Sequence, residues 1–489
     1  MFSFVTALVM LCVGYFIYGS IVEKVFGMEA DRKTPCYTLG DGVDYLPMPT
    51  WKVFLIQFLN IAGTGPIFGS ILGVLFGPAA FIWIVLGCIF AGAVHDYMCG
   101  MICIRKDGTS VPEFVGDEMG GFMRHLMRVL SLLLLILAGT VFVTTPADLL
   151  DTMVASSGFL WSKYFWVLII FLYYIFATLL PIDKLIGKVY PLFGMAMFIM
   201  AGGLLYGIFF MDGTVPEVTE AFHNYNPTSN IPLIPALCVT ISCGAISGFH
   251  ATQSPLMARC ITNEKHGRAI FYGSMIAEGI IALIWAASSI KFADSLDVAG
   301  NTPYEKLVTA MTNPETGKMS PSLLVNSICS SWMGIAGSAL AVLGVIAAPI
   351  TSGDTAFRSA RLIVADFMKV SQKTFLRRFM LCLPLFAVCS CLLFLDFTVL
   401  WRYSAWTNQT LATIMLWAAT IWMVKLHRGS GWLLTFMPAI FMTFICTCYI
   451  VLAPEGFALD GRIAYTFAGI VSIVSTVCFL VWKNKRIVT

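Results

Sequence analysis

The chain has 489 residues, of which 58% are hydrophobic and only 12% are charged, about half the charged fraction of an ordinary soluble domain. This composition argues against a water-soluble protein, because most charged residues lie in short segments between long apolar runs. The net charge is +3, and no basic run or aromatic-interleaved basic patch indicates a nucleic-acid partner.

Long apolar runs recur along the whole chain, and each could cross about 30 Å of hydrocarbon. The first run follows no Lys or Arg and precedes no small-residue cleavage site, so we interpret it as a retained helix rather than a signal peptide. We predict thirteen membrane-spanning helices, at 2–22, 51–75, 79–103, 125–147, 164–181, 189–210, 232–256, 269–290, 331–350, 375–396, 409–424, 430–452 and 463–482. The connection 291–330 contains an amphipathic segment, Tyr304 to Met311, that forms either a lid or a surface loop.

Most of the 30 Lys and Arg residues fall in alternate connections and in the C-terminal tail. Because Lys and Arg are enriched in cytoplasmic loops, this alternation predicts a multi-pass plasma (cytoplasmic) membrane protein with its N-terminus outside and its C-terminus in the cytoplasm. The predicted units are an N-terminal helix with a cytoplasmic loop (1–50), two five-helix repeats (51–210 and 232–424), and two peripheral C-terminal helices with a short cytoplasmic tail (430–489).

Helix-breaking residues interrupt two of the predicted spans. The second span carries Ala62-Gly63-Thr64-Gly65-Pro66, and the seventh carries a Gly- and Ser-rich stretch from Ser242 to Pro255. Unwound backbone leaves N–H and C=O groups without partners, which lipid does not tolerate, so such segments are expected to face a cavity or a ligand. Half-helix N-termini attract carboxylates and C-termini attract cations. The alternative is that the glycines only allow close helix packing.

The two interrupted spans begin five-helix units of opposite orientation. Helices 2–6 and 7–11 are therefore candidate inverted repeats, although no residue-level repeat is visible. An all-α membrane protein with a leucine-transporter-like 5+5 inverted repeat, with broken helices 2 and 7, is the predicted fold. Such a fold places the substrate near the two breaks.

Ionisable residues inside spans are costly and tend to mark ion pathways. The candidate ion-coupling residues are His95, Asp96, Glu278, Asp354 and Lys188, and His250 lies in the seventh span. Structural alternatives stay open: Asp354 could cap a cytoplasmic helix, and His95-Asp96 could pair with Arg105 or Arg358.

Thr351 and Ser352 place two hydroxyls near the level where the second span should break. Together with the carbonyls of Ala62 and Gly65 they form a candidate Na⁺ site, and the Lys188 ammonium is an alternative occupant of the same region. Proton coupling through the ionisable residues is the competing hypothesis. We expect no cofactor other than such a Na⁺ ion.

Several motifs resemble the carbon starvation protein A (CstA) family of membrane transporters in its shorter form. They are Asp41–Tyr45, Ala62–Pro66, Ala91–Asp96, Gly244–His250, Gln253–Cys260, Pro349–Arg361 and Trp406–Gln409, and the resemblance extends to about residue 425. It implies nutrient uptake under carbon starvation, with pyruvate or short peptides as substrates, and a leucine-transporter fold.

From position we select the substrate-binding candidates Asn60, Gly63, Thr64, Gly65, Ser247, Gly248, Phe249, His250, Thr252, Gln253, Asn408 and Gln409. A small anion such as pyruvate suits a half-helix N-terminus with a hydroxyl from Thr64, Ser247 or Thr252. A peptide needs polar groups for both termini. The expected partners are thus a small-molecule substrate, a coupling cation and the lipid bilayer.

We expect a secondary transporter that imports these nutrients by H⁺ or Na⁺ symport, and no enzyme. An intramembrane enzyme is the main alternative, but neither a G-x-S-x-G nor an H-E-x-x-H pattern occurs. A channel would favour pore-lining rings and a sensor an appended soluble domain, and neither is visible. A phosphate-binding P-loop is also absent from the sequence, which favours an ion gradient over ATP as the driving force.

Overall fold

The structure, a computed structural model, describes residues 1–42, 44–154, 162–179, 182–220, 222–228, 231–314, 317–370, 372, 374–395, 397–426 and 429–488. The side chains of 152–154, 179, 182–189, 220, 336–338, 340, 341 and 486–488 are not described. Within these residues the secondary structure is helical, apart from one isolated bridge between Thr312 and Met319. The predicted all-α class is confirmed.

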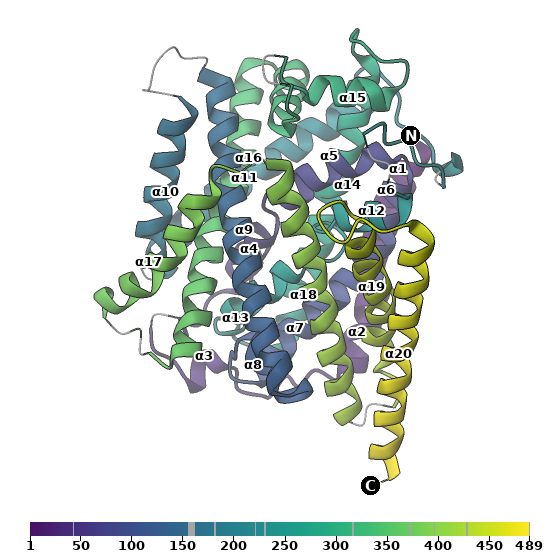
Figure 1. The fold of residues 1–489 in the computed structure, drawn as a ribbon. Helices are drawn as coiled ribbons and strands as arrows, with labels where there is room; N and C mark the ends of the chain where they lie inside the picture. Colours follow the sequence, from purple (N-terminus) through teal and green to yellow (C-terminus); the bar gives the residue numbers. More distant parts are fainter. Residues whose placement is uncertain are drawn as a thin grey trace.

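The helices follow one another in a bundle whose termini lie at opposite ends (Figure 1). The α-helices are α1 (Phe2–Phe16), α2 (Tyr18–Phe26), α3 (Pro35–Thr38), α4 (Thr50–Ile61), α5 (Ser70–Gly73), α6 (Ala79–Gly87), α7 (Ala93–Arg105), α8 (Val111–Met119), α9 (Gly121–Val154), α10 (Lys163–Leu179), α11 (Ile182–Phe210), α12 (Leu233–Thr240), α13 (Gly248–Ala258), α14 (Gly273–Ser295), α15 (Pro303–Met311), α16 (Pro321–Met368), α17 (Phe375–Leu392), α18 (Phe397–Lys425), α19 (Leu433–Leu452) and α20 (Gly461–Val488). Short π or 3-10 turns are η1 (Gly65–Gly69), η2 (Val74–Phe76), η3 (Cys88–Gly92), η4 (Val218–Glu220), η5 (Glu264–His266) and η6 (Arg268–Tyr272).

Eight helices in the described residues are long and apolar enough to cross a membrane, or up to nine if the bent pair Thr50–Ile61 and Gly65–Phe76 is one span. The predicted count of thirteen is therefore not confirmed. Helices do occupy the other four predicted positions, as α10, α12 with α13, α16 and α18. Of these, α10 has only 17 residues, and α12 and α13 are separate helices of 8 and 11 residues.

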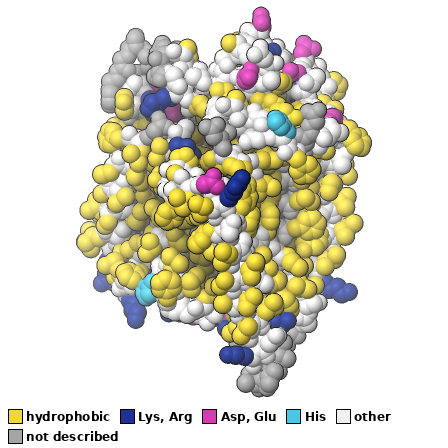
Figure 2. All heavy atoms as spheres, turned by 45° about the vertical axis from the view of Figure 1, so that its right-hand side comes forward, with side chains coloured by type: hydrophobic (Ala, Val, Ile, Leu, Met, Phe, Trp, Pro, Cys, Tyr) yellow, Lys and Arg dark blue, Asp and Glu magenta, His cyan; other side chains and the backbone are white. Residues whose placement is uncertain are grey.

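Apolar side chains cover the middle of the molecule, as lipid contact requires. On the face shown in Figure 2 this hydrophobic belt is continuous, Lys and Arg lie at the lower end and also in the upper half, and Asp and Glu lie only in the upper half. The C-terminus lies at the lower end and the N-terminus near the upper end (Figure 1). The segment Tyr304 to Met311 is helical as α15 and packs against α14, with Leu307 and Met311 fully buried.

Both predicted helix breaks are present. In the second span α4 ends at Ile61, and the chain resumes beyond Gly63 and Thr64 in the π turn η1, with a bend of 51°. In the seventh span α12 ends at Thr240 and α13 begins at Gly248. Gly244 between them has φ +93°, and a Cβ there would lie 2.5 Å from the Cβ of Ala282, so only glycine fits this turn.

The long helices α9, α11 and α16 pack together on one side of the breaks, and α13 packs against α7 on the other. α18 contacts both α9 and α13, while α19 and α20 follow it as the outermost pair in Figure 1. The two breaks are therefore surrounded by helices from both halves of the chain. This packing positions the candidate site.

Candidate functional site

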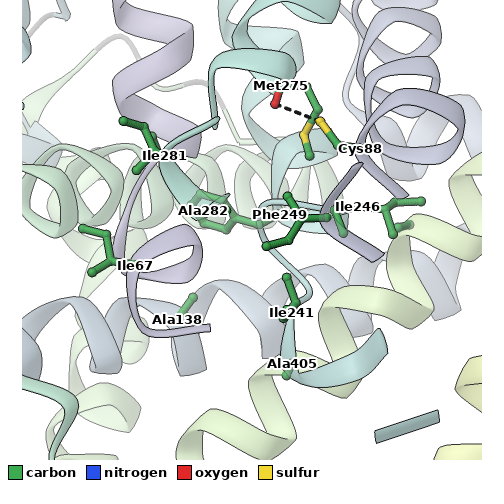
Figure 3. Packing of buried hydrophobic residues seen from close by; sticks show 14 of the residues in the cluster. Ile67, Cys88, Ala138, Ile241, Ile246, Phe249, Met275, Ile281, Ala282 and Ala405 are labelled. Atoms are coloured by element: carbon green, nitrogen blue, oxygen red, sulfur yellow. Dashed lines mark hydrogen bonds between the residues drawn. The ribbon is translucent and has the colours of Figure 1, made fainter. Parts of the chain in front are cut away.

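The two broken spans meet in the middle of the bundle. A Cβ added to Gly65 would lie 2.4 Å from Sγ of Cys243, and one added to Gly63 would lie 2.6 Å from Oγ of Ser352. Such close approach requires glycine at both positions of the first break. Figure 3 shows Ile67 of the first broken span and Ile241, Ile246 and Phe249 of the second, which all belong to one apolar cluster.

A central cavity of about 40 Å³ lies between the two breaks. Its lining residues come from the first break, the second break, α9 and α18: Ile61, Gly63, Thr64, Gly65, Leu134, Ala138, Phe142, Ser242, Cys243, Phe249, Trp401, Ser404, Ala405 and Asn408. Ligand pockets usually enclose about 300–1,000 Å³. The cavity is well below that range, with room for roughly three water molecules.

A larger vestibule of about 290 Å³ lies on the other side of Trp401. Its lining includes Leu72, Thr240 and Phe397, and Trp401 is shared with the central cavity. The rings of Phe397 and Trp401 lie 5.6 Å apart, and Phe68 contacts Phe397 edge-on at 6.4 Å. These aromatic rings stand between the two spaces.

The N-terminus of α13 is capped by a side chain from another helix. Asn408 of α18 accepts a hydrogen bond through Oδ1 from the Phe249 backbone N–H at 2.7 Å and another from the Ser247 hydroxyl at 3.1 Å. Its Nδ2 lies 3.6 Å from Sγ of Cys243. An amide oxygen therefore occupies the position where the sequence predicted a substrate carboxylate.

The structure brings together only some of the predicted substrate-binding residues. Gly63, Thr64, Gly65, Phe249 and Asn408 line the central cavity, and the buried Ser247 reaches it through Asn408. The remaining candidates lie outside its lining: Asn60, Gly248, His250, Thr252, Gln253 and Gln409.

Those remaining candidates have other partners. Asn60 Oδ1 accepts from the Tyr190 hydroxyl at 3.1 Å, and Gln409 donates to the Cys238 carbonyl at 3.0 Å. Thr252 lines a separate small pocket, and its hydroxyl accepts from Gln253 at 2.8 Å. These four side chains therefore make structural hydrogen bonds around the breaks. Gly248 instead permits close packing, because a Cβ there would lie 2.4 Å from the Asn408 carbonyl oxygen.

Four of the ionisable candidates form one buried chain of contacts. His95 Nδ1 lies 2.8 Å from Asp96 Oδ1, and His250 Nδ1 lies 2.7 Å from Asp96 Oδ2. On its other side, His250 Nε2 lies 3.2 Å from Glu278 Oε2. All four side chains are fully buried, and α7, α13 and α14 supply them.

The two arginines proposed as structural partners of Asp96 lie elsewhere. Arg105 binds Glu264, with Nη2 to Oε2 at 3.1 Å, and Arg358 Nη2 lies 3.8 Å from Asp354 Oδ1. Asp354 sits inside α16, so it does not cap a helix start. Within the described residues, neither of its oxygens accepts a hydrogen bond. The side chain of Lys188 lies outside the described residues.

The hydroxyls of the candidate Na⁺ site do contact the first broken span. Thr351 donates to the Leu59 carbonyl at 2.9 Å and Ser352 donates to the Asn60 carbonyl at 2.8 Å. The carbonyls are those of Leu59 and Asn60 in the last turn of α4, whereas the sequence pointed to Ala62 and Gly65. The junction of α4 and α16 is therefore a cluster of oxygen atoms.

Sequence reasoning missed three residues at the centre. Cys243 lines the cavity, and its place inside the second break was the available signal. Trp401 and Phe142 also line it. Trp401 was assigned to a connection because α18 begins at Phe397, earlier than the apolar run indicated.

Three side chains of the kinds that bind metal ions converge beside the cavity. Cys243, His250 and Glu278 each offer one ligand atom, and these atoms all lie within 4.8 Å of one another. Cys243 comes from the second break, His250 from the first turn of α13 and Glu278 from α14.

The sequence model of "Carbon starvation protein CstA" matches residues 1–153 and 143–313. The chain belongs to the CstA family. It is 45% identical over 341 residues to an uncharacterised membrane protein of Haemophilus influenzae, covering 60% of this chain and 92% of that protein. This membership confirms the family resemblance predicted from the motifs.

Two CstA-family relatives have transporter names. The chain is 28% identical to the peptide transporter CstA of Campylobacter jejuni, over 57% of this chain and 48% of the relative. It is also 28% identical to the pyruvate/proton symporter BtsT of Escherichia coli, over 60% of this chain and 49% of the relative. The chain thus spans about half the length of these named relatives.

The fold resembles that of a solved metal-ion transporter. A crystal structure of the Eremococcus coleocola manganese transporter (mutant H236A) matches with a TM-score of 0.57 and 14% identity, covering 91% of this chain and 98% of that chain. The likeness concerns the fold alone. Together with the two broken spans, it supports the leucine-transporter-like fold predicted for this CstA-family member.

Proposed function

We propose that this CstA-family protein is a secondary active transporter that imports small carboxylates of the pyruvate type by cation symport. The observation that carries the proposal is the small cavity bounded by both helix breaks. Unwound backbone beside an enclosed space is the usual substrate site of such folds. The transporter names of the two relatives support the same class.

The size of the cavity favours a small substrate. At about 40 Å³ it needs modest expansion to admit a molecule of a few heavy atoms, and far more to admit a peptide. Thr64 and Asn408 offer a hydroxyl and an amide at its wall. When substrate binds, its carboxylate would accept a hydrogen bond from the Phe249 N–H, which now donates to Asn408 Oδ1.

Short peptides are the second candidate, and a different space favours them. A pocket of about 320 Å³ near the ends of α9, α10 and α16 carries both charge signs, with Asp148, Asp151, Lys163 and Lys318 in its lining. A peptide has one terminus of each sign. Lys163 Nζ lies 2.6 Å from Asp148 Oδ1, so a peptide would have to replace that ion pair.

We assign the coupling cation to the junction of α4 and α16. The carbonyls of Leu59 and Asn60, the two hydroxyls that contact them, and the buried carboxylate of Asp354 are all oxygen ligands. The buried Asp354 carboxylate accepts no hydrogen bond in the described residues, and its ion pair with Arg358 Nη2 is long, at 3.8 Å, so H⁺ or Na⁺ at this junction would stabilise it further. The name of the pyruvate/proton symporter favours H⁺.

The orientation belongs to the same proposal. On the face shown in Figure 2, the described charged side chains at the end that holds the C-terminus (Figure 1) are Lys and Arg. Because cytoplasmic loops are enriched in Lys and Arg, we place the C-terminus in the cytoplasm and the N-terminus outside. The vestibule beyond Trp401 then opens to the outside.

The test is uptake by the purified protein in proteoliposomes. Labelled pyruvate and a labelled dipeptide are each supplied with an inward proton gradient, an inward sodium gradient, or neither. We expect pyruvate to accumulate only with the proton gradient, and Asp354→Asn to abolish accumulation while counterflow exchange persists. Accumulation of the dipeptide alone would change the proposed substrate class to peptides. If neither compound shows gradient-dependent uptake, the proposal is overturned.

A further inference from the structure

The converging side chains Cys243, His250 and Glu278 have the spacing of a metal site. Their ligand atoms lie within 4.8 Å of one another, and His250 Nε2 is 3.2 Å from Glu278 Oε2. In a tetrahedral zinc site, N and O ligands at about 2.0–2.1 Å from the metal lie roughly 3.3 Å from each other. The nitrogen and the oxygen therefore already have the separation of two ligands on one ion.

The Cys243 thiol at this point also contacts Asn408 Nδ2 at 3.6 Å and the Ser247 hydroxyl at 3.4 Å, whereas the His250 and Glu278 atoms lack partners elsewhere in the described residues. In the described part of the chain, both oxygens of Glu278 and the Nε2 of His250 make no hydrogen bond, and both side chains are fully buried. A carboxylate buried without a donor is costly unless it is paired or binds a metal. A cation between the three residues would satisfy all of these atoms at once.

A second carboxylate holds the imidazole in place. His250 Nδ1 lies 2.7 Å from Asp96 Oδ2, and Asp96 is itself held at Oδ1 by His95 at 2.8 Å. Metal-binding histidines usually donate their other ring N–H to a carboxylate, which fixes the tautomer and directs the free nitrogen at the metal. Asp96 stands in that position, so Nε2 is the nitrogen that faces Glu278.

We propose that Cys243, His250 and Glu278 bind one divalent transition-metal cation of borderline softness, such as Zn²⁺. One thiolate, one imidazole and one carboxylate suit such an ion, whereas Mg²⁺ and Ca²⁺ prefer oxygen alone. Three protein ligands leave a fourth position open. Because Cys243 lines the central cavity, that position faces the cavity and takes a water molecule or an oxygen of a solute.

One other arrangement uses the same atoms without a metal. A doubly protonated His250 would bridge Asp96 and Glu278, with one ring N–H for each carboxylate. Cys243 would then have no part in the cluster. The contribution of the thiol therefore separates the two arrangements. The metal inference concerns the purified protein alone and does not depend on which substrate is transported.

The test is cobalt binding to the full-length protein in detergent, with any affinity tag removed and metals stripped by a chelator. Co²⁺ is the probe because a bound thiolate adds a near-ultraviolet charge-transfer band to the visible bands of a tetrahedral site. We expect one Co²⁺ per chain, displaced by one equivalent of Zn²⁺. Cys243→Ser should lose the charge-transfer band, and Asp96→Asn should weaken binding by about 10–100-fold.

The matched control is Cys238→Ala, which removes a buried thiol from the other half of the same broken span. It should leave the spectrum and stoichiometry unchanged. Glu278→Gln provides a second ligand variant, and size-exclusion elution shows which variants are folded. The proposal is overturned if folded wild type binds no Co²⁺ or Zn²⁺, or if Cys243→Ser and Cys238→Ala give the same spectrum. Neither result would alter the outcome of the pyruvate uptake experiment.

Discussion

Replacing Asn408 with alanine should destabilise the second break more than a surface substitution would. The amide oxygen accepts from the Phe249 N–H at 2.7 Å and from the Ser247 hydroxyl at 3.1 Å, and Asn408 and both partners are buried. A buried donor left without an acceptor costs about 1–3 kcal/mol, and a lost neutral hydrogen bond costs about 1 kcal/mol. We expect Asn408→Ala to lower the free energy of unfolding by about 2–4 kcal/mol.

The assay is reversible unfolding of the purified protein in mixed detergent micelles with increasing denaturing detergent. Asn408→Asp is the matched variant, because it keeps the acceptor oxygens and places a negative charge at the N-terminus of α13, although that charge is buried. Its stability should lie between those of wild type and Asn408→Ala. If the free energy of unfolding of Asn408→Ala lies within about 0.5 kcal/mol of the wild-type value, the Asn408 cap does not stabilise the break and the reasoning fails.

Three further predictions concern the gate, a buried ion pair and the coupling site. Trp401→Ala removes the ring that lines both the vestibule and the central cavity. The rate at which a polar maleimide alkylates Cys243 should therefore rise at least about tenfold, as measured by mass spectrometry. Arg105→Ala leaves the fully buried carboxylate of Glu264 without its 3.1 Å partner and should lower the unfolding free energy by about 3–5 kcal/mol in the same denaturation assay. Asp354→Asn should leave pyruvate exchange intact but make it insensitive to the proton gradient, as measured by counterflow at two external pH values.

Each of these predictions has an outcome that contradicts it. Trp417→Ala, which removes a buried tryptophan from the same helix outside the cavity lining, should not change the alkylation rate of Cys243. Equal rates in the two Trp variants would refute the gate. An Arg105→Ala protein as stable as wild type would show that the pair with Glu264 contributes nothing. Unchanged gradient dependence in Asp354→Asn would remove that residue from the coupling site.

The sequence predicted the helix breaks because their cause is local. Glycine and proline in Ala62–Pro66 and in the stretch before Gly248 prevent regular helix wherever the chain lies, and both breaks appear where expected. The opposite orientation of the two units was inferred from the positions of Lys and Arg and stays a prediction. The number of spans stays a prediction: eight or nine helices of the described residues are long and apolar enough to cross a membrane, and helices also occupy the other four predicted positions.

The site itself depends on contacts that local sequence does not contain. Asn408 caps a helix that begins 160 residues earlier in the chain, and Asp96 meets His250 across 154 residues. Asp96, His250 and Glu278 do lie together, and their proposed roles in ion coupling and substrate binding stay predictions. Their partners could not be named, because the packing of α7, α13 and α14 decides which intramembrane charges face one another.

The most direct test of the central claim is whether pyruvate protects the cavity thiol. Cys243 lines the central cavity, whereas Cys391 is exposed on α17 and serves as the internal reference. In proteoliposomes with an inward proton gradient, saturating pyruvate should slow alkylation of Cys243 at least about tenfold while Cys391 reacts at an unchanged rate. Equal alkylation of Cys243 with and without pyruvate would contradict the assignment of this cavity as the substrate site.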